Sequence, residues 1–493
     1  FSPSRIYYIP SHIRKDTVAD GSDIQDRLVN LINVPDINLR SNLYTTEDFL
    51  DSLQVSKNYM ADQNLYIRER IFDMWIGDWN KMNENWEWQS HTVNDSVIYT
   101  PIVIDRNHAF TKVDGVLFKQ MLKMLSLDFI CNYDSLILKD TKKINKLAFA
   151  LDMAVAGRSD ESVWIRQAQE IRKQMTDSLI DSAFTYLPEG VKHDEIELIK
   201  QKLKRRRLEL EAVASQYYRL LQRTPVVAGT NQSDYFLIER QAPDRTILRI
   251  YDPETGDCRL EQQFSGKETK ELWLYGLAGN DTFEVKGNTR KDFPIYLISG
   301  EGENQYQLNH SRKIHVYDKD YKYDYQKIKY HKISFTPWGI YDSDKGISLG
   351  TFFTYTMYGF KRAPFTYQHR IGYNYLKGFM YAGVFPNYDG RRRLYLNASI
   401  SSPRNFENFF GFGNNTAGYK EEKKNYNRVK LRTYMFNPSF EMDLRKEEVM
   451  TFFGSLDMYK AKRTDDRYIY TVYGEDHPIF RTNYFVGLGA TYR

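Results

Sequence analysis

The sequence predicts a multidomain protein: an α+β, mainly helical region, then a small β domain, then an antiparallel transmembrane β-barrel. The first observation behind this is the distribution of aromatic residues, which make up 15% of the 493 residues. They occupy about one position in five after His331 and about one in nine before it, so composition divides the chain into physically different parts. The second observation is a change in hydrophobic period along the chain. Together they predict three domains, over residues 1–225, 226–330 and 331–493.

The first domain is predicted mainly from helical periodicity. Residues 62–88 begin as an amphipathic helix and end in a polar, Asn-rich turn. Further helical patterns cover 116–135, 161–186 and 192–222. The last contains the basic run KLKRRR (202–207), which is expected to be a solvated helix face.

The second domain is predicted from short strands and two glycine-rich turns. The segments GLAGNDTFEVKG (276–287) and ISGEGENQYQL (298–308) approximate a repeat whose Asp binds calcium in a parallel β-roll. Asp281 and Asn304 occupy that position, although Asn304 lacks the charge. Two copies are few for a calcium roll, so the pattern favours a small β-solenoid without metal. No cofactor is required, and calcium at these two residues is the alternative.

The third domain is predicted from about eight segments of roughly ten residues with alternating apolar and polar positions. In the first, Ile347, Leu349 and Phe353 alternate with Ser348 and Thr354. A soluble β-sandwich shows the same alternation. Aromatic residues at the strand ends and a basic inner face favour membrane-spanning strands instead.

Four basic residues are expected to face the lumen of this barrel: Arg393, Arg428, Lys430 and Arg432. Eight strands can close a narrow barrel. The chain begins at Phe1 and ends inside a strand-like pattern, so we expect truncation at both ends and further strands in the complete protein.

A cluster of acidic and amide residues raises the question of phosphotransfer. Asp78, Asn80 and Asn85 follow the first helix, and Asp105 ends an extended segment. Kinase-type folds use an Asp to orient the acceptor hydroxyl, and an Asn and a second Asp to bind magnesium. The alternative is an ordinary Asn-rich turn.

The order of several segments resembles a known family. The segments are YIRERIFDMWIGDWNKMNENWEW, YTPIVIDRNHAFTKVDG, LIDSAFTYLPEG, LKRRRLELEAVASQYYRLL, ELWLYGLAGNDTFEVKG and NFFGFGNNTAGY. This succession resembles a family of Bacteroidota envelope proteins, over nearly the whole chain. The family combines an optional calcineurin-like metallophosphoesterase domain, a kinase-like region and a BamA/TamA-like (surface-antigen) outer-membrane β-barrel. The metallophosphoesterase domain would precede Phe1.

The resemblance implies a degenerate, pseudokinase-like region. Family members typically read I-G-D-W-D-R-H-x-D-Q-W, which places Asn80 at the catalytic Asp, Lys81 at the Arg and Met82 at the His. In the family pattern P-I-P-R-D-R-D-x-A-F, Asp105 matches a metal-binding position and Asn107 replaces a second acidic residue. Asn85 also matches a metal-binding position, so magnesium is the expected metal if one is bound. Because an amide cannot accept a proton as a carboxylate does, no catalytic residue is expected.

The resemblance therefore implies an outer-membrane protein with a non-catalytic periplasmic docking region, a subunit of an envelope complex for outer-membrane protein assembly or translocation. Its partners would be outer-membrane lipid and other envelope proteins. One alternative is an envelope phosphotransferase or metallophosphoesterase tethered to a barrel, and another is an anion-preferring pore.

Several other classes find no support in the sequence. The net charge of +5 is small for this length and does not suggest nucleic-acid binding. Cys131 and Cys258 are too few for a disulfide scaffold. The chain has no G-x-S-x-G, P-loop or dinucleotide-binding glycine pattern, and its histidines lack metal-binding spacing.

Overall fold

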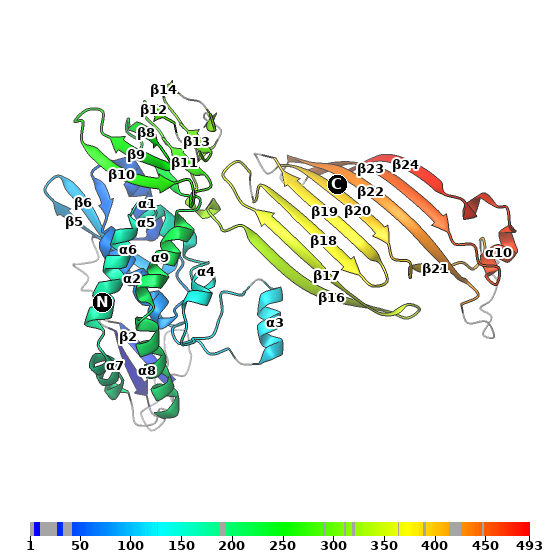
Figure 1. Cartoon of the computed structure of the whole chain (residues 1–493), viewed down its shortest axis with the longest axis horizontal. Helices are drawn as coiled ribbons and strands as arrows, with labels where there is room; N and C mark the ends of the chain where they lie inside the picture. The colour runs from blue at the N-terminus through cyan, green and yellow to red at the C-terminus, as the bar shows by residue number, and fades with distance from the viewer. Residues whose placement is uncertain are drawn as a thin grey trace. The chain divides into compact units, whose positions relative to one another are not determined.

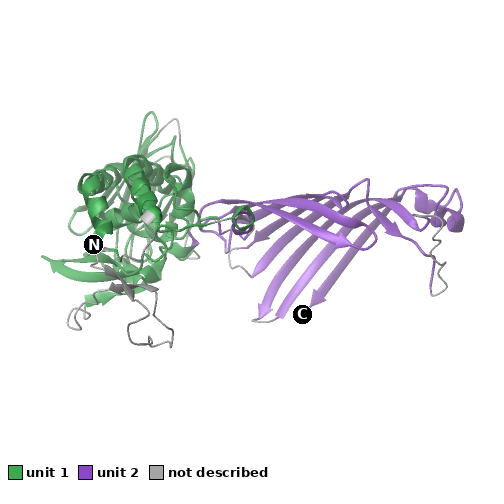
Figure 2. Ribbon diagram, turned by 90° about the horizontal axis from the view of Figure 1, so that it is seen from below, with its two compact units in different colours: residues 1–118, 128–326 green, residues 119–127, 327–493 purple. Residues whose placement is uncertain are grey.

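The computed structural model describes most of the chain as two compact units. The described residues are 4–9, 27–32, 42–113, 115–125, 127–187, 193–288, 292–309, 312–317, 321–362, 364–387, 391–413, 425–445 and 448–493. Most of the first 41 residues of the predicted kinase-like region therefore lie outside the described part. Unit 1 comprises residues 1–118 and 128–326, and unit 2 comprises 119–127 and 327–493 (Figure 2). The main division falls close to His331, where the composition changes.

Unit 1 contains most of the helices (Figure 1). They are α1 (Thr46–Val55), α2 (Gln63–Ile76), α4 (Thr141–Ile144), α5 (Phe149–Ala156), α6 (Glu161–Gln174), α7 (Asp177–Ala183), α8 (His193–Arg207) and α9 (Leu210–Leu221), with 3-10 turns η2 (Asn83–Asn85), η3 (Leu138–Asp140), η4 (Phe184–Tyr186) and η5 (Tyr325–Lys327). Helix α3 (Val116–Met124) and η5 each extend across a boundary between the units. No helix in the described residues is both long enough and apolar enough to cross a lipid bilayer.

Helix α2 positions the candidate site at its C-terminal end. It begins at Asp62, whose side chain accepts a hydrogen bond from the Leu65 N–H over 3.0 Å. It ends at Gly77, which adopts the left-handed conformation with φ of 77°. Its buried residues, including Ile67 and Ile71, pack in a core shared with α6 and α9. The chain therefore leaves α2 through a tight turn directly into Asp78.

Two sheets lie in the N-terminal part of unit 1. One pairs β1 (Ser4–Ile9) with β2 (Arg27–Ile32). The other has the order β3-β5-β6-β4, from β3 (Leu43–Tyr44), β4 (Tyr59–Ala61), β5 (Trp86–Val93) and β6 (Ser96–Val103). Strands β5 and β6 follow the Asn-rich turn, so the sheet holds that turn against the end of α2.

The later strands of unit 1 form two sheets between which the chain alternates. The five-stranded sheet has the order β10-β9-β8-β12-β14 and the four-stranded sheet β15-β13-β11-β7. The strands are β7 (Val226–Ala228), β8 (Tyr235–Gln241), β9 (Arg245–Tyr251), β10 (Cys258–Ser265), β11 (Leu272–Tyr275), β12 (Thr282–Gly287), β13 (Ile295–Ile298), β14 (Gln305–Leu308) and β15 (Ile314–Tyr317). Strands β7, β11, β13 and β15 pair in parallel, as do β8, β12 and β14.

This alternation makes the region solenoid-like, with a dry core between the two sheets. Phe236, Phe283, Leu274 and Leu297 are among its fully buried side chains. The glycine-rich turns predicted from the sequence connect one sheet to the other.

Unit 2 is built on a nine-stranded antiparallel sheet (Figure 2). Its order is β16-β17-β18-β19-β20-β22-β23-β24, with β21 paired to β22. The strands are β16 (Lys332–Asp342), β17 (Gly346–Met357), β18 (Tyr367–Asn374), β19 (Gly378–Pro386), β20 (Arg392–Ser401), β21 (Phe406–Asn408), β22 (Arg428–Arg445), β23 (Glu448–Ala461) and β24 (Asn483–Tyr492). Helix α10 (Tyr468–Tyr473) and η6 (Pro478–Phe480) lie between the last two strands.

The sheet is open in the described residues. Strands β16 and β24 each pair with one neighbour and form its two edges. The sequence predicted a barrel that is incomplete in this chain, and among the described residues β16 and β24 do not pair with each other.

The registers place one continuous apolar face on this sheet. Opposed residues of antiparallel strands share a face, so the pairs can be followed from β16 to β24. For example, Phe353 opposes Ile371, Phe436 opposes Leu456, and Leu456 opposes Val486. The face comprises Ile333, Phe335, Pro337, Gly339, Tyr341, Ile347, Leu349, Thr351, Phe353, Tyr355, Met357, Tyr367, His369, Ile371, Tyr373, Phe379, Tyr381, Gly383, Phe385, Leu394, Leu396, Ala398, Ile400, Tyr434, Phe436, Pro438, Phe440, Met442, Met450, Phe452, Gly454, Leu456, Met458, Tyr484, Val486, Leu488, Ala490 and Tyr492. Charged residues on this face lie toward the strand ends, with Arg392 opposite Met442 at one end and Arg432 opposite Lys460 at the other.

The opposite face is mixed and polar, and it is concave. A hollow on it is lined by residues of several strands, including Ser348, Ser399 and Thr433. The Lys345 ammonium, in the turn between β16 and β17, lies 2.7 Å from the Glu407 carboxylate of β21. Because these elements are far apart in the strand order, the sheet curves around its polar face.

Candidate functional site

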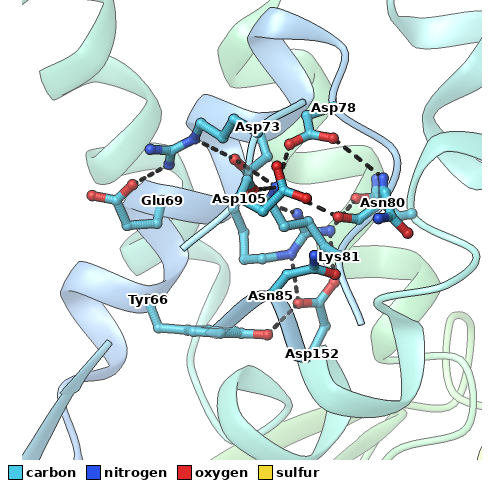
Figure 3. A network of polar contacts seen from close by, with 12 residues as sticks. Tyr66, Glu69, Asp73, Asp78, Asn80, Lys81, Asn85, Asp105 and Asp152 are labelled. Atoms are coloured by element: carbon cyan, nitrogen blue, oxygen red, sulfur yellow. Dashed lines mark hydrogen bonds and ion pairs between the residues drawn. The ribbon is translucent and has the colours of Figure 1, made fainter. Parts of the chain in front are cut away.

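The predicted kinase-like residues lie in a buried polar network at the end of α2 (Figure 3). At its centre Arg70 of α2 is 1% exposed and makes ion pairs with two carboxylates. Its guanidinium donates to Asp152 over 2.8 and 3.1 Å, to Asp73 over 3.2 Å and to the Asn145 amide oxygen over 2.6 Å. The Tyr66 hydroxyl also donates to Asp152. Asp152 lies within the otherwise apolar helix α5, so this network ties α5 to α2.

A second cation, Lys81, is fully buried among oxygen atoms. Its ammonium donates to the Asp78 carboxylate and to the Asp105 carbonyl oxygen, the latter over 2.6 Å, and it lies 3.8 Å from the Asp73 carboxylate. Arg106 approaches the same Asp73 oxygen, over 2.9 Å, and also pairs with Glu69. Lys81 therefore joins the turn after α2 to the segment after β6.

The environment of Asp78 raises the pKa of its carboxyl group to about 6. Burial is the largest cause, since a low-dielectric surrounding disfavours the charged form. The charge of Asp73 adds to this effect, and the ammonium of Lys81 opposes it. Asp78 is thus held in its charged form mainly by Lys81.

The four residues selected from the sequence come together around this lysine, in unequal roles. Asp78 binds the ammonium, whereas Asn80 contributes its N–H to the Asp78 carboxylate over 3.3 Å. The Asn85 amide oxygen accepts a hydrogen bond from the Met82 N–H over 2.9 Å. The Asp105 carboxylate accepts from the Asn107 N–H over 2.7 Å. Asn85 and Asp105 therefore stabilise their own turns.

These residues fit a magnesium ion poorly. The Asn85 side-chain oxygen and the Oδ1 of Asp105 already accept backbone hydrogen bonds, and the Lys81 ammonium donates to the Asp105 carbonyl oxygen. Magnesium requires several unengaged oxygen ligands in near-octahedral geometry. Within the described residues, no group of three or more His, Cys, Asp and Glu side chains is arranged to hold a metal ion.

Three stacked turns form a second polar cluster in unit 1. They run from Gly229 to Asp234, from Gly276 to Asp281 and from Ser299 to Asn304, each after a strand of one sheet and before a strand of the other. The Asp281 carboxylate accepts a hydrogen bond from the Asp234 N–H over 2.8 Å. The Asn304 amide oxygen accepts from the Asp281 N–H over 3.0 Å. The side chains thus form a ladder across the turns.

One oxygen of this ladder is left without a partner. Asp281 is fully buried, and its Oδ2 has no hydrogen-bond partner in the structure. Burial, reinforced by the neighbouring charge of Asp234, raises the pKa of Asp281 to about 8, although the Asp234 N–H and Lys57 oppose the shift. The equivalent oxygen of Asp234 accepts from the Thr230 N–H over 2.7 Å.

Asp281 and Asn304 fit calcium poorly for the same reason that Asn85 and Asp105 fit magnesium poorly. Calcium takes six to eight oxygen ligands. Here Asp281 Oδ1 and Asn304 Oδ1 accept backbone hydrogen bonds, which leaves Asp281 Oδ2 as a single unengaged oxygen. The ladder joins the turns through hydrogen bonds from backbone N–H groups to the Asp281 and Asn304 side chains.

The four basic residues predicted for the lumen do not share a face, and this expectation is wrong. Arg393 opposes Glu441 on the polar face and forms ion pairs with Glu441 and Asp443. Along β22 the register is continuous from Leu431 to Asp443, so Arg432 lies on the same face as Tyr434 and Phe436. Lys430 and Arg428 precede it on that face. The sequence correctly predicted that these three residues of β22 share one face. It placed them on the polar face with Arg393, whereas they lie on the apolar face.

Several participants were not identified from the sequence. Asp73, Arg70 and Asp152 complete the network, and the single Asp in the apolar stretch FALDMAVA was a usable signal. Asp234 completes the ladder, and its five-residue spacing from Gly229 repeats that of Gly276 and Asp281.

The basic run 202–207 is also only partly solvated. Arg206 is 3% exposed, and it donates to the Trp75 carbonyl over 2.7 Å and to the Met74 carbonyl at the end of α2. A guanidinium on the last carbonyls of a helix favours the helix dipole.

No family model, curated protein or solved structure matches this chain.

Proposed function

We propose that residues 331–493 are membrane-spanning strands of an outer-membrane β-barrel, and that unit 1 is a non-catalytic docking region of an envelope complex. The observation that carries the first part is the apolar face, which extends in register from β16 to β24 and carries its charged residues, such as Arg392, Arg432 and Lys460, toward the strand ends. Many of its side chains are exposed, including Leu488 at 90%, Val486 at 74% and Ile333 at 76%. An exposed apolar surface of this extent is costly in water and favourable against lipid.

The geometry around Lys81 supports the docking part. The position that the family resemblance assigns to the general base is Asn80, and an amide cannot take the proton of an acceptor hydroxyl. The ammonium of Lys81 is engaged by Asp78 and the Asp105 carbonyl, so both segments serve the fold. Helix α3, which begins in unit 1 and extends into unit 2, offers a surface for a partner, because Leu117 and Met121 are exposed one helical turn apart.

An anion-preferring pore has less support. Its cationic wall rested on four basic residues facing the lumen. Of these, Arg393 is on the polar face, and its charge is compensated by Glu441 and Asp443.

The membrane proposal is tested by one charge placed on either face of β23. Leu456→Arg puts a guanidinium on the apolar face, opposite Phe436 and Val486. An arginine at the bilayer midplane costs about 2–4 kcal/mol. We therefore expect the variant to co-float much less with phosphatidylcholine liposomes than the wild type.

The matched control is Ser455→Arg, on the neighbouring residue and the polar face, opposite Gly487. It should float as the wild type does. Equal flotation of both variants, or a wild-type chain that does not float, contradicts the membrane assignment. A particle with the mass of a single chain, after purification from membranes in mild detergent, contradicts an envelope complex.

A further inference from the structure

The strands of unit 2 have a near end and a far end. The near end is the end at which the chain enters the sheet, at Lys332, which opposes Thr356. Pro386, Arg393 and Arg445 also lie at this end. The turn from Asp342 to Gly346 therefore lies at the far end. The long strands β22 and β23 begin and end there, at Arg428 and Ala461 respectively.

The apolar face changes character at this far end. The last apolar residues of β22 and β23 on this face are Tyr434 and Met458, which oppose each other, and Tyr484 of β24 opposes Met458. The next residues outward on the same face are Arg432 and Lys460, again directly opposed. One further step outward come Lys430 and Lys462, whose backbones are joined by a 2.8 Å hydrogen bond from the Lys462 N–H to the Lys430 carbonyl.

We call these four residues the basic cluster: Lys430, Arg432, Lys460 and Lys462. All four are exposed, and in the described residues none forms an ion pair. Like charges directly opposite each other destabilise an antiparallel pair. Two consecutive pairs of this kind, with no carboxylate paired to them among the described residues, favour an anionic ligand at this position.

The other side of the same strand ends is occupied. Val429 and Leu431 alternate with the basic residues and pack against Ala461, Ile469 of α10 and Phe480 of η6. The side chains of the basic cluster therefore lie on the apolar face of the sheet and not on the concave, polar face.

We infer that the basic cluster binds the phosphate of an anionic lipid head group at the membrane surface, an inference that rests on the proposed membrane function. Along β22 and its neighbours β23 and β24, aliphatic and aromatic residues are followed by Tyr434 and Tyr484, and then by the paired cations of β22 and β23. This order follows the order from acyl chain through interface to head group. Arginine and lysine donate charge-assisted hydrogen bonds to phosphate oxygens. With the N-terminal region in the periplasm, the far end meets the external leaflet.

The experiment compares the full chain, purified in non-ionic detergent, with a variant lacking the four charges. The cluster variant is K430Q/R432Q/K460Q/K462Q. The control variant, K173Q/R245Q/K267Q/K270Q, removes the same charge from exposed positions of unit 1. Phosphatidic acid, phosphatidylcholine and inorganic phosphate are titrated separately, and native mass spectrometry measures the bound fraction.

We expect the cluster variant to bind phosphatidic acid at least about tenfold more weakly than the wild type, and the control variant to match the wild type. Phosphatidylcholine binding should be the same in all three proteins. Phosphatidic acid should also raise the thermal unfolding midpoint of the wild type and of the control variant, but not that of the cluster variant. Without lipid, the cluster variant should be at least as stable as the wild type, because like-charge repulsion is removed.

Undiminished phosphatidic acid binding in the cluster variant overturns the inference. Inorganic phosphate binding as tightly as phosphatidic acid also overturns it, since the cluster would then be a free-phosphate site. Failure of the membrane proposal is separate: in that case the wild type and both variants fail to float with phosphatidylcholine liposomes. If all three float and phosphatidic acid does not distinguish them, the lipid inference fails alone.

Discussion

The family resemblance places Lys81 in a kinase-like motif, whereas its contacts in the structure join parts of the fold. It is buried against Asp78 and Asp73, and its ammonium reaches the Asp105 carbonyl. Removing one member of a buried ion pair leaves an uncompensated charge, which is far more costly than the pair is stabilising. The contacts of Lys81 therefore matter for stability in a way that its sequence position does not reveal.

Replacing Lys81 by Met should lower the free energy of unfolding by about 3–5 kcal/mol, because the buried Asp78 carboxylate loses its cation, whereas Asp73 keeps Arg70 and Arg106. Urea unfolding followed by tryptophan fluorescence measures this, since Trp338 is the only tryptophan outside unit 1. Lys81→Arg keeps the charge and is the control, expected to retain most of the stability. A Met variant as stable as the wild type contradicts the structural role.

Asp281 should make the stability of unit 1 depend on pH. Its folded-state pKa is raised to about 8 from an ordinary value of 3.8, so the folded state holds a proton that the unfolded state releases. The stabilisation from this group is complete below about pH 4 and is lost as the pH rises toward 8.

In Asp281→Asn this contribution to the pH dependence should disappear, while the Oδ1 acceptor for the Asp234 N–H is kept. Asparagine already occupies the equivalent place at Asn304, so it fits such a turn. Urea midpoints at pH 5 and pH 8 should differ less in the variant than in the wild type. An unchanged difference would mean that Asp281 is ionised in the folded state.

At the level of elements, the solenoid-like region depends on close approach between its turns. A Cβ on Gly279 would lie 2.6 Å from the Gln232 carbonyl carbon, and one on Gly302 would lie 1.8 Å from the Gly279 carbonyl oxygen. Both glycines also have positive φ. The stacking of turns is thus possible only with glycine at these positions.

Gly279→Ala should destabilise unit 1 more than Gly256→Ala. Both positions have positive φ, which costs an alanine about 1 kcal/mol or more, but only Gly279 also meets a neighbouring backbone. The overlap should add about 1–3 kcal/mol. Urea unfolding of the two variants gives the difference directly, and equal midpoints would show that the turns separate without cost.

At the level of the whole molecule, the chain combines a buried polar network in unit 1 with a sheet in unit 2 that has one apolar face. Neither the full chain nor Asn80→Asp should transfer phosphate from ATP. A carboxylate at position 80 does not free Asp78 from Lys81, nor the Asp105 carboxylate from the Asn107 N–H. Radiolabel transfer from ATP to the chain or to added casein measures this. Transfer by either protein would contradict a non-catalytic unit 1.

Local periodicity was enough to predict much of the architecture. The period-2 alternation after His331, the helical patterns and the glycine-rich turns correspond to the large antiparallel sheet, to helices and to the turns between two parallel stacks. Side-chain direction within a strand or helix depends on near neighbours in the sequence, so a sequence can indicate it. The sequence predicted one helical region over 161–186, whereas the structure has two helices there, and the Thr176 side chain caps the start of the second, α7.

Only the tertiary structure decided which partners each polar group meets. The sequence placed Arg393 and Arg432 on one face, whereas the register of Arg393 against β22 and that of Arg432 against β23 put them on opposite faces. It selected Asp78, Asn80, Asn85 and Asp105 and missed Asp73 and Asp152, which lie on other turns and helices of the same network. The physical reason is that burial, register and ion pairing depend on residues distant in the chain, whereas the alternation of a strand or a helix is local.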